Sequence, residues 1–135
     1  MKKINKVLIN LIICCTIITI ITGCNKVNSK NTEIQKLQSD LIILSEKNSQ
    51  RYFNKKLNTK DFDISLAKQV KENEYEDIKT LDGVKNIYMI GHFNGKPSDI
   101  VEFVLVYNLQ SKKVIEFGIK NLKNDNMVYA NLKEE

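Results

Sequence analysis

The amino-acid sequence predicts an α+β domain in which one long helix packs on a four-stranded antiparallel β-meander. Three observations predict this class. Apolar residues recur at helical spacing from Ile34 onward, residues 84–132 hold four β-like stretches, and short polar turns separate these stretches. Because an apolar sheet face must be covered, the helix and the sheet are expected to form two layers. We expect this single domain to span residues 32–135.

A basic head and an apolar run precede this domain. Lys2, Lys3 and Lys6 come first, and residues 7–22 are then almost entirely apolar. This order is typical of a secretory signal. The run is slightly long for a cleaved signal and slightly short for a membrane-spanning helix, which needs about 20 apolar residues. Its length therefore leaves both interpretations open.

A small residue and a cysteine end the apolar run, in the order Ile21-Thr22-Gly23-Cys24. This stretch resembles the lipobox of bacterial lipoprotein precursors, and the resemblance covers only the leader. It implies that diacylglycerol is attached to the thiol of Cys24 and that a peptidase cuts the Gly23–Cys24 bond. Residues 1–23 would then be a lipoprotein signal peptide. An uncleaved helical anchor is the alternative.

The resemblance also implies a location. The mature protein would lie on the extracytoplasmic face of the cell membrane, held by acyl chains such as palmitate rather than by a transmembrane helix. Each buried CH₂ group contributes roughly 0.8 kcal/mol, and two acyl chains give stable anchoring where one is marginal. Heavy use of Lys, Ile and Asn, with no Trp, suggests a low-GC Gram-positive bacterium.

Composition narrows the function classes. Cys14 and Cys15 leave with the signal and Cys24 is lipidated, so the mature chain keeps no thiol for catalysis, disulfide bonding or zinc binding. The chain has 21 basic and 16 acidic residues, but three basic residues lie in the leader, so the net charge falls from +5 to +2. Lysines and glutamates are mixed, which excludes a basic stripe for nucleic acid. We expect no cofactor.

The elements follow in order after the leader. Residues 24–31 are polar and form the expected tether between the lipid and the domain. Residues 32–35 read Thr-Glu-Ile-Gln and fit a capping box with Thr32 as the N-cap. The apolar spacing then predicts a helix to about Leu57. Residues 45–51, SEKNSQR, interrupt the apolar stripe, which predicts an exposed or slightly bent middle turn.

Residues 60–82 carry two conflicting patterns. Phe62, Ile64 and Leu66 alternate as residues of a strand do, whereas the apolar residues from Leu66 onward suit a helix only moderately. We expect a short strand or loop, followed by a short helix that ends near Asp82.

The four expected strands are residues 84–93, 100–109, 113–120 and 127–132. Asn94-Gly95 is a hairpin dipeptide typical of a type I′ turn, and residues 96–98 lengthen this connection. Residues 110–112 and 123–126 supply the other turns. The arrangement resembles the cystatin-like or NTF2-like domains of small bacterial lipoproteins. That resemblance is architectural and carries no functional residue across.

Candidate catalytic residues are few. His92 is the only histidine, and a catalytic role needs an acidic partner within hydrogen-bond reach, for which Asp99 and Glu102 are candidates. We favour the simpler interpretation of a half-exposed strand residue. One histidine without cysteine does not make a zinc site. Glu102 and Glu116 are candidates for a carboxylate pair across adjacent strands, but a domain of this size offers little room for a glycosidase cleft.

An acidic cluster is the other candidate site, and its members are Glu72, Glu74, Glu76 and Asp77. It lacks the Asp-x-Asp-x-Asp-Gly spacing of a calcium loop, and lysines interleave with it, so we expect a solvated helix face. Asp61 and Asp63 are expected to cap or turn the chain. The sequence has no phosphate loop, serine elbow or zinc-protease helix, and we expect no enzyme.

Two functions remain. The leading expectation is a non-enzymatic protein-binding module of an envelope, conjugation, secretion or phage-exclusion system, anchored through Cys24. The alternative is capture of a small apolar or peptide ligand in a concave pocket of the sheet, lined by aromatics such as Tyr88 and Tyr129. An exposed apolar patch or an unpaired edge strand favours the first function. A dry aromatic-lined pocket favours the second.

Overall fold

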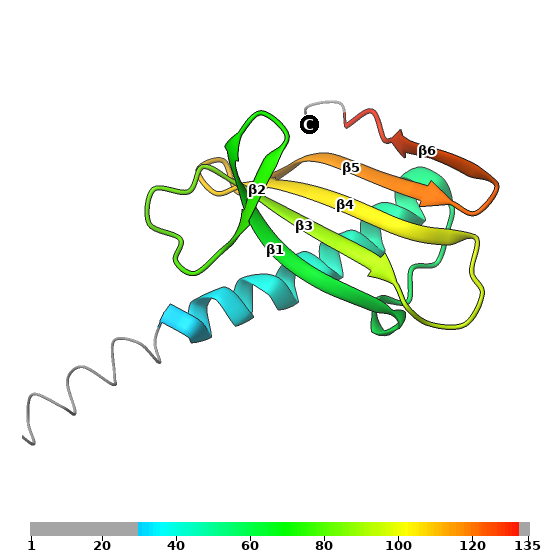
Figure 1. Ribbon diagram of the computed structural model, residues 1–135, viewed down its shortest axis with the longest axis horizontal. Coiled ribbons are helices and arrows are strands. Elements are labelled where there is room, and N and C mark those ends of the chain that lie inside the picture. Colours follow the sequence, from blue (N-terminus) through cyan, green and yellow to red (C-terminus); the bar gives the residue numbers. More distant parts are fainter. Residues whose placement is uncertain (1–29, 133–135) are drawn as a thin grey trace, which may run out of the picture. The chain divides into compact units, whose positions relative to one another are not determined.

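The computed structural model describes residues 30–132, and the chain divides into two compact units, residues 1–35 and 36–135. The second unit is α+β, because helix residues 36–53 lie across one face of a six-stranded antiparallel sheet (Figure 1). The predicted class is confirmed, whereas the predicted number of four strands is wrong. No helix among the described residues is long and apolar enough to cross a membrane. The expected signal peptide and Cys24 lie outside the described residues.

The helix covers residues 30–53 of the described chain. It is already formed at Thr32, so the predicted N-cap at that residue is wrong, as is a tether that reaches residue 31. The helix also ends earlier than predicted, because Asn54 adopts a left-handed conformation with φ 53°. The Lys55 N–H donates to the Ser49 carbonyl at 3.2 Å and closes the last turn.

One face of the middle of the helix is buried, whereas Lys47, Gln50 and Arg51 are exposed, so the predicted exposure of residues 45–51 is wrong for the buried face. Leu41, Ser45, Asn48 and Ser49 are all buried, and they follow one another at helical spacing. The two small serines let the helix backbone approach the sheet closely. Their hydroxyl groups are buried and have no hydrogen-bond partner among the described residues.

The strands of the sheet lie in the order β2-β1-β3-β4-β5-β6 and pair antiparallel throughout. Their bounds are β1 Phe62–Lys71, β2 Glu74–Asp77, β3 Asn86–Phe93, β4 Ile100–Asn108, β5 Lys113–Asn121 and β6 Asn124–Tyr129. A short 3₁₀ helix, Thr59–Asp61, leads into β1. β2 and β6 therefore form the two edges of the sheet.

The hairpin of β1 and β2 replaces the short helix that the sequence predicted before Asp82. Asn73 turns the chain with φ 60°, which places Gln69 opposite Tyr75 and Lys68 opposite Glu76. The mixed charges of this segment belong to an exposed edge hairpin. An edge strand exposed on both faces carries no apolar alternation, so the sequence pattern resembled that of a solvated helix.

The other four strands confirm the predicted meander, with shifts at its ends. β6 begins three residues earlier than predicted and ends at Tyr129. Neither Asn94 nor Gly95 has a positive φ, so the type I′ turn predicted there does not form, and the loop from β3 to β4 is longer. The predicted β4–β5 turn is present: Lys112 has φ 55° and the Ser111 N–H donates to Asn108 Oδ1 at 2.8 Å.

The core lies between the helix and the inner face of the sheet. Leu66, Met89, Leu105 and Phe117 stand opposite one another on β1, β3, β4 and β5, and all four are buried. The Phe53 ring at the end of the helix lies 6.0 Å from the Phe117 ring, centroid to centroid. The helix thus covers the centre of the inner face and leaves the outer face to solvent.

Candidate functional site

The side chains considered for catalysis are partly or largely exposed to solvent. His92 Nδ1 is 3.2 Å from Glu102 Oε2 on the neighbouring strand, and the two side chains are 64% and 31% exposed. Asp99 instead contacts Lys55. Neither His92 nor Glu102 lines a cavity described here.

The carboxylates do not gather into a site either. Glu102 stands opposite Lys120 and Glu116 opposite Val106, so the proposed pair across adjacent strands does not form. The acidic cluster lies on the β1–β2 hairpin, where Lys71 reaches Glu74 at 3.4 Å. Over residues 30–132, no three metal-ligating side chains converge.

Asp61 forms hydrogen bonds with the nearby Asn58, which agrees with the capping or turn role predicted from the sequence. Asn58 Nδ2 donates to Asp61 Oδ2 at 2.8 Å, and the Asp61 N–H donates to the Asn58 carbonyl at 3.0 Å. Asp63 is exposed and stands opposite His92 on the outer face.

Three tyrosines gather on the outer face of the sheet. Tyr75 and Tyr88 meet edge to face with their ring centroids 4.9 Å apart, and the Tyr88 hydroxyl donates to Gln69 at 3.0 Å. Tyr129 lies over Gly118, which stands opposite it on β5. We call Tyr75, Tyr88 and Tyr129 the outer tyrosine cluster.

Two of these tyrosines, Tyr88 and Tyr129, have pKa values raised above the usual range. Burial raises the pKa of Tyr88 above its usual range, and the nearby Tyr75 and Glu116 act in the same direction. Burial likewise raises the pKa of Tyr129, followed by the charge of Glu116. The outer tyrosine cluster thus offers aromatic surface and neutral hydroxyl groups, as protein-binding surfaces often do.

β6 presents an open edge. The N–H of Ala130, just after β6, donates to the Phe117 carbonyl on β5 at 2.8 Å. Main-chain groups alternate in direction along an antiparallel strand, so Val128 points its N–H and C=O toward β5. Met127 and Tyr129 then point theirs away from the sheet, where no other described strand lies.

The side chains around this edge do not protect it. Residues 126–131 read Asn-Met-Val-Tyr-Ala-Asn and carry no charge. Val128 and Tyr129 project to opposite faces of the sheet and are 41% and 54% exposed. The one charged residue of β6, Asp125, lies near its start and reaches Lys120 at 3.1 Å. The uncharged remainder of the edge, with apolar side chains on both faces, is the kind that accepts another strand.

The opposite edge is protected. β2 has four residues, all exposed, and three of them are acidic: Glu74, Glu76 and Asp77. Its pairing with β1 is irregular between Gln69 and Lys71, as the pairing of β6 with β5 is between Lys120 and Asn121. What distinguishes β2 is its charge and its shortness, which are devices by which proteins block edge pairing. The sheet therefore has one blocked edge and one open edge.

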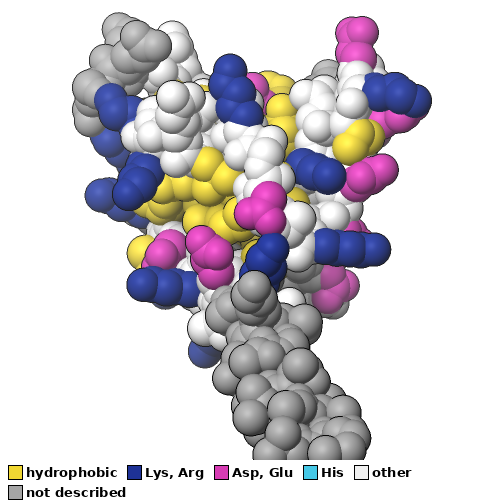
Figure 2. Space-filling model, turned by 90° about the vertical axis from the view of Figure 1, so that its left-hand side faces the viewer, with side chains coloured by type: hydrophobic (Ala, Val, Ile, Leu, Met, Phe, Trp, Pro, Cys, Tyr) yellow, Lys and Arg dark blue, Asp and Glu magenta, His cyan; other side chains and the backbone are white. Residues whose placement is uncertain are grey.

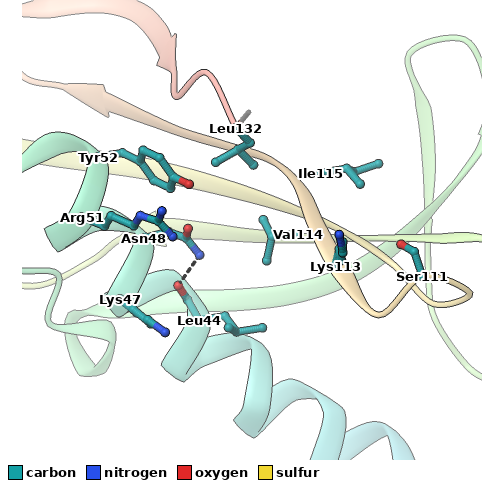
Figure 3. A pocket seen from close by; sticks show the side chains of 10 residues that line it. All are labelled: Leu44, Lys47, Asn48, Arg51, Tyr52, Ser111, Lys113, Val114, Ile115 and Leu132. Carbon is teal, nitrogen blue, oxygen red and sulfur yellow. Dashed lines mark hydrogen bonds between the residues drawn. The ribbon is translucent and has the colours of Figure 1, made fainter. Parts of the chain in front are cut away.

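A groove of about 850 Å³ lies between the helix and the start of β5. We call it the helix–β5 groove. The residues on its helix side are Leu44, Lys47, Asn48, Arg51 and Tyr52, whose spacing places them on one flank of the helix. The residues on its other side are Ser111, Lys113, Val114, Ile115 and Leu132 (Figure 3).

Local contacts and a β-bulge determine how the side chains lie on the two walls of the groove. Asn48 Nδ2 donates to the Leu44 carbonyl at 2.7 Å, which turns the amide back onto the helix, and Arg51 Cζ lies 5.2 Å from the centroid of the Tyr52 ring. On the strand side, Val114 stands opposite Tyr107 and Glu116 opposite Val106, so Ile115 is an extra residue. This β-bulge takes Ile115 out of the regular alternation.

The lining of the groove is apolar and cationic. Leu44, Val114, Ile115 and Leu132 supply aliphatic surface, and Lys47, Arg51 and Lys113 supply positive charge. Among residues 30–132, no carboxylate lines it. Figure 2 shows the left-hand side of the view in Figure 1, where hydrophobic side chains gather and both basic and acidic side chains lie around them.

Comparisons with known proteins add no relative. No protein-family description matches this chain, no curated protein matches it, and no solved structure matches it. The functional argument therefore depends on the surfaces described above.

Sequence reasoning missed the helix–β5 groove. Lys47 and Arg51 lie within residues 45–51, and the sequence pattern indicates for this stretch only an interruption of the apolar stripe. Their spacing of four residues, with Leu44 one turn before, was a signal that the two cations share a helix flank. Their position beside Lys113 depends on the packing of the helix and carries no signal in the sequence.

Proposed function

We propose that this chain is a membrane-anchored lipoprotein, lipidated at Cys24 on the extracytoplasmic face, whose domain binds another protein. The binding mode is strand addition: an extended segment of the partner pairs with β6. The setting is an envelope, conjugation, secretion or phage-exclusion system. Helix and sheet together are proposed to form a domain of the cystatin-like or NTF2-like type.

The single observation that carries this proposal is the contrast between the two sheet edges. The outward N–H and C=O groups of Met127 and Tyr129 offer main-chain hydrogen bonds to a partner strand. Val128 on the inner face and Tyr129 on the outer face provide contacts for alternate side chains of that strand. Nothing comparable is offered by the acidic β2 edge.

A partner segment suits β6 better than a second copy of the chain. Two copies joined through β6 would share only a ladder of six residues on each strand. A flexible segment also reaches the exposed outer tyrosine cluster and so gains further contact area. Enzymatic function has no comparable support, because no enclosed cluster of reactive groups occurs in residues 30–132.

The test is in-cell cross-linking of the full lipidated chain, followed by mass spectrometry of the captured proteins. A Cys24→Ala chain reports on anchoring. Met127→Pro reports on strand addition, because proline removes an N–H that points away from the sheet and leaves the β5 ladder intact. We expect Cys24→Ala to lose the partner and Met127→Pro to reduce its yield at least about fivefold.

The matched control is Asp77→Pro, which removes an outward N–H from the blocked β2 edge. It should leave the partner yield unchanged. Equal loss with both proline variants in folded proteins would refute strand addition at β6. Cross-links from one copy to another, with no second protein, would instead assign β6 to a dimer.

A further inference from the structure

A carboxylate stands beside the outer tyrosine cluster. Tyr88 on β3 and Glu116 on β5 both stand opposite Val106 on β4, so these three side chains form one cross-strand row on the outer face. Tyr129 on β6 stands opposite Gly118, which follows Glu116 by two residues on the same face. Besides burial, which is the largest cause, the charge of Glu116 raises the pKa of both Tyr88 and Tyr129.

Much of the ring surface in this cluster is open to solvent. Val106 projects to the outer face but is only 3% exposed, so neighbouring side chains cover it. Tyr75 and Tyr129 are themselves exposed, and Tyr129 lies over Gly118, which has no side chain. The face of an aromatic ring carries partial negative charge, so exposed rings beside a carboxylate attract cations.

The surroundings of the cluster favour a cation from a partner. Asp77 follows Tyr75 by two residues on the same face of β2 and adds a second exposed carboxylate to that of Glu116. Lys120 also projects to the outer face, but its ammonium group lies 3.1 Å from Asp125 Oδ1. The charge of this surface is therefore complementary to a positively charged partner group.

An arginine side chain matches this surface better than other cations do. Its planar guanidinium stacks on a ring face and donates hydrogen bonds in its own plane to a carboxylate such as that of Glu116. A quaternary ammonium donates no hydrogen bond and suits an enclosed cage of rings, whereas these rings form an open surface. A lysine ammonium is compact and strongly hydrated, so it gains less from stacking.

The open edge at β6 lies within reach of this carboxylate. Adjacent strands are about 4.8 Å apart, so a strand added to β6 would lie roughly 10 Å from β5, with Tyr129 between the two. The extended side chains of an arginine on that strand and of Glu116 together span this distance.

We propose that the outer tyrosine cluster and Glu116 bind an arginine side chain of the partner segment. The guanidinium stacks on the Tyr129 ring and donates hydrogen bonds to the Glu116 carboxylate. This assignment rests on the proposed strand addition at β6, which supplies the arginine.

The experiment titrates the full chain, in maltoside micelles and at constant ionic strength, with N-acetyl-arginine amide. The rings of the five tyrosines carry carbon-13 for detection by NMR, and Tyr52 and Tyr107, outside the cluster, serve as internal references. We expect saturable shifts of Tyr75 and Tyr129 in the millimolar range, with the references unchanged. N-acetyl-citrulline amide, which has nearly the same shape without the charge, should bind at least about fivefold more weakly.

Two variants test the contacts of the guanidinium. Glu116→Gln should weaken binding of the arginine compound at least about fivefold, and Tyr129→Leu, which removes the ring, about threefold. The matched control is Glu76→Gln, the same change next to Tyr75 but on the other face of the sheet, and it should bind as the parent does. An unchanged Tyr107 resonance verifies that each variant is folded.

Three results would overturn the proposal. Absence of a saturable shift at the cluster would show that it holds no cation. Equal binding of the citrulline compound, or equal binding by Glu116→Gln and the parent, would show an aromatic surface without charge selectivity. Tighter binding of tetramethylammonium than of the arginine compound would assign the cluster to quaternary ammonium groups instead.

The small ligand separates this proposal from strand addition. Met127→Pro should lose partner yield in cells but still bind the arginine compound, because it removes a main-chain N–H and none of the rings. Glu116→Gln should lower the partner yield while it leaves the β6 edge intact. Full partner yield with Met127→Pro would refute strand addition, whereas loss of yield with Met127→Pro but not with Glu116→Gln would refute the arginine site alone.

Discussion

The ring of Phe103 lies directly over the backbone of Gly91, its neighbour across β3 and β4. A Cβ atom added at Gly91 would come within 2.1 Å of Phe103 Cε1, well inside contact distance. Phe103 is fully buried and lies between the rings of Phe62 and Phe117. The glycine therefore makes the space in which the central aromatic ring of the core packs.

We predict that Gly91→Ala destabilises the domain by about 1–3 kcal/mol, because interiors do not accommodate an extra methyl group without strain. Urea unfolding measures the free energy. In a Phe103→Leu background the smaller side chain leaves room for the methyl group, so the same alanine should cost clearly less. An equal cost in both backgrounds would mean that the ring is not what excludes the side chain.

The buried serines of the helix predict a stabilising change. The hydroxyl of Ser49 is fully buried without a hydrogen-bond partner in residues 30–132, and such a group costs about 1–3 kcal/mol in desolvation. Alanine removes the hydroxyl and also favours the helix. We expect Ser49→Ala to raise the free energy of unfolding by about 0.5–2 kcal/mol.

Ser49→Val is the matched control in this series. Valine is also apolar but larger and β-branched, so it should destabilise where the helix backbone lies close to the sheet. If both replacements stabilise the domain equally, the close helix–sheet approach is not limited by the size of residue 49.

Lys55 and Asp99 predict an acid-dependent contribution. The hydrogen bond from Lys55 lowers the pKa of the Asp99 carboxyl, so its contribution is present above the unfolded-state pKa and is lost as pH falls through the folded one. Both side chains are about half exposed, so Asp99→Asn should cost at most about 1 kcal/mol at pH 7. The difference in the free energy of unfolding between Asp99→Asn and the parent should disappear below about pH 4 and become smaller in 1 M salt. A difference that persists at low pH would point to the shape of the side chain instead.

The outer tyrosine cluster predicts a weakness at alkaline pH. Because the folded-state pKa values of Tyr88 and Tyr129 are raised, the folded chain keeps protons that the unfolded chain releases above about pH 10. Stability should therefore fall as pH rises through this range. Ultraviolet titration should show late ionisation of tyrosines in the folded protein. Glu116→Gln removes a nearby negative charge and should bring that ionisation to lower pH.

The parts of this fold that were predictable from the sequence are those with apolar periodicity. β3, β4 and β5 alternate and are paired in the predicted order, and Leu41 faces the core at helical spacing. β1 begins at Phe62, where the alternation of Phe62, Ile64 and Leu66 favoured a short strand or loop. Its continuation to Lys71 and the edge strand β2 were missed, because main-chain hydrogen bonds and the turn at Asn73 hold this hairpin. Main-chain hydrogen bonds and a turn of this kind leave little trace in the pattern of apolar and polar residues along the sequence.

The open edge and the helix–β5 groove were even harder to predict from the sequence. The open edge exists only because β6 is last in the sheet order, and the groove exists because the helix flank meets the bulge at Ile115. Ser45 and Ser49 are buried, although their polarity favoured the prediction of an exposed turn. Small polar residues also occur where a helix lies close to a sheet. Packing, rather than local pattern, decided each of these outcomes.

The blocked β2 edge has a consequence for stoichiometry. Growth of copies into a filament needs a donor edge and an acceptor edge on each molecule, since only a head-to-tail contact can repeat without closing. Here one edge is closed by Glu74, Glu76 and Asp77, so a strand added at β6 ends the sheet. If the chain is anchored and binds a partner segment as we propose, each copy would engage one such segment and remain a discrete unit, even where copies crowd together on a membrane.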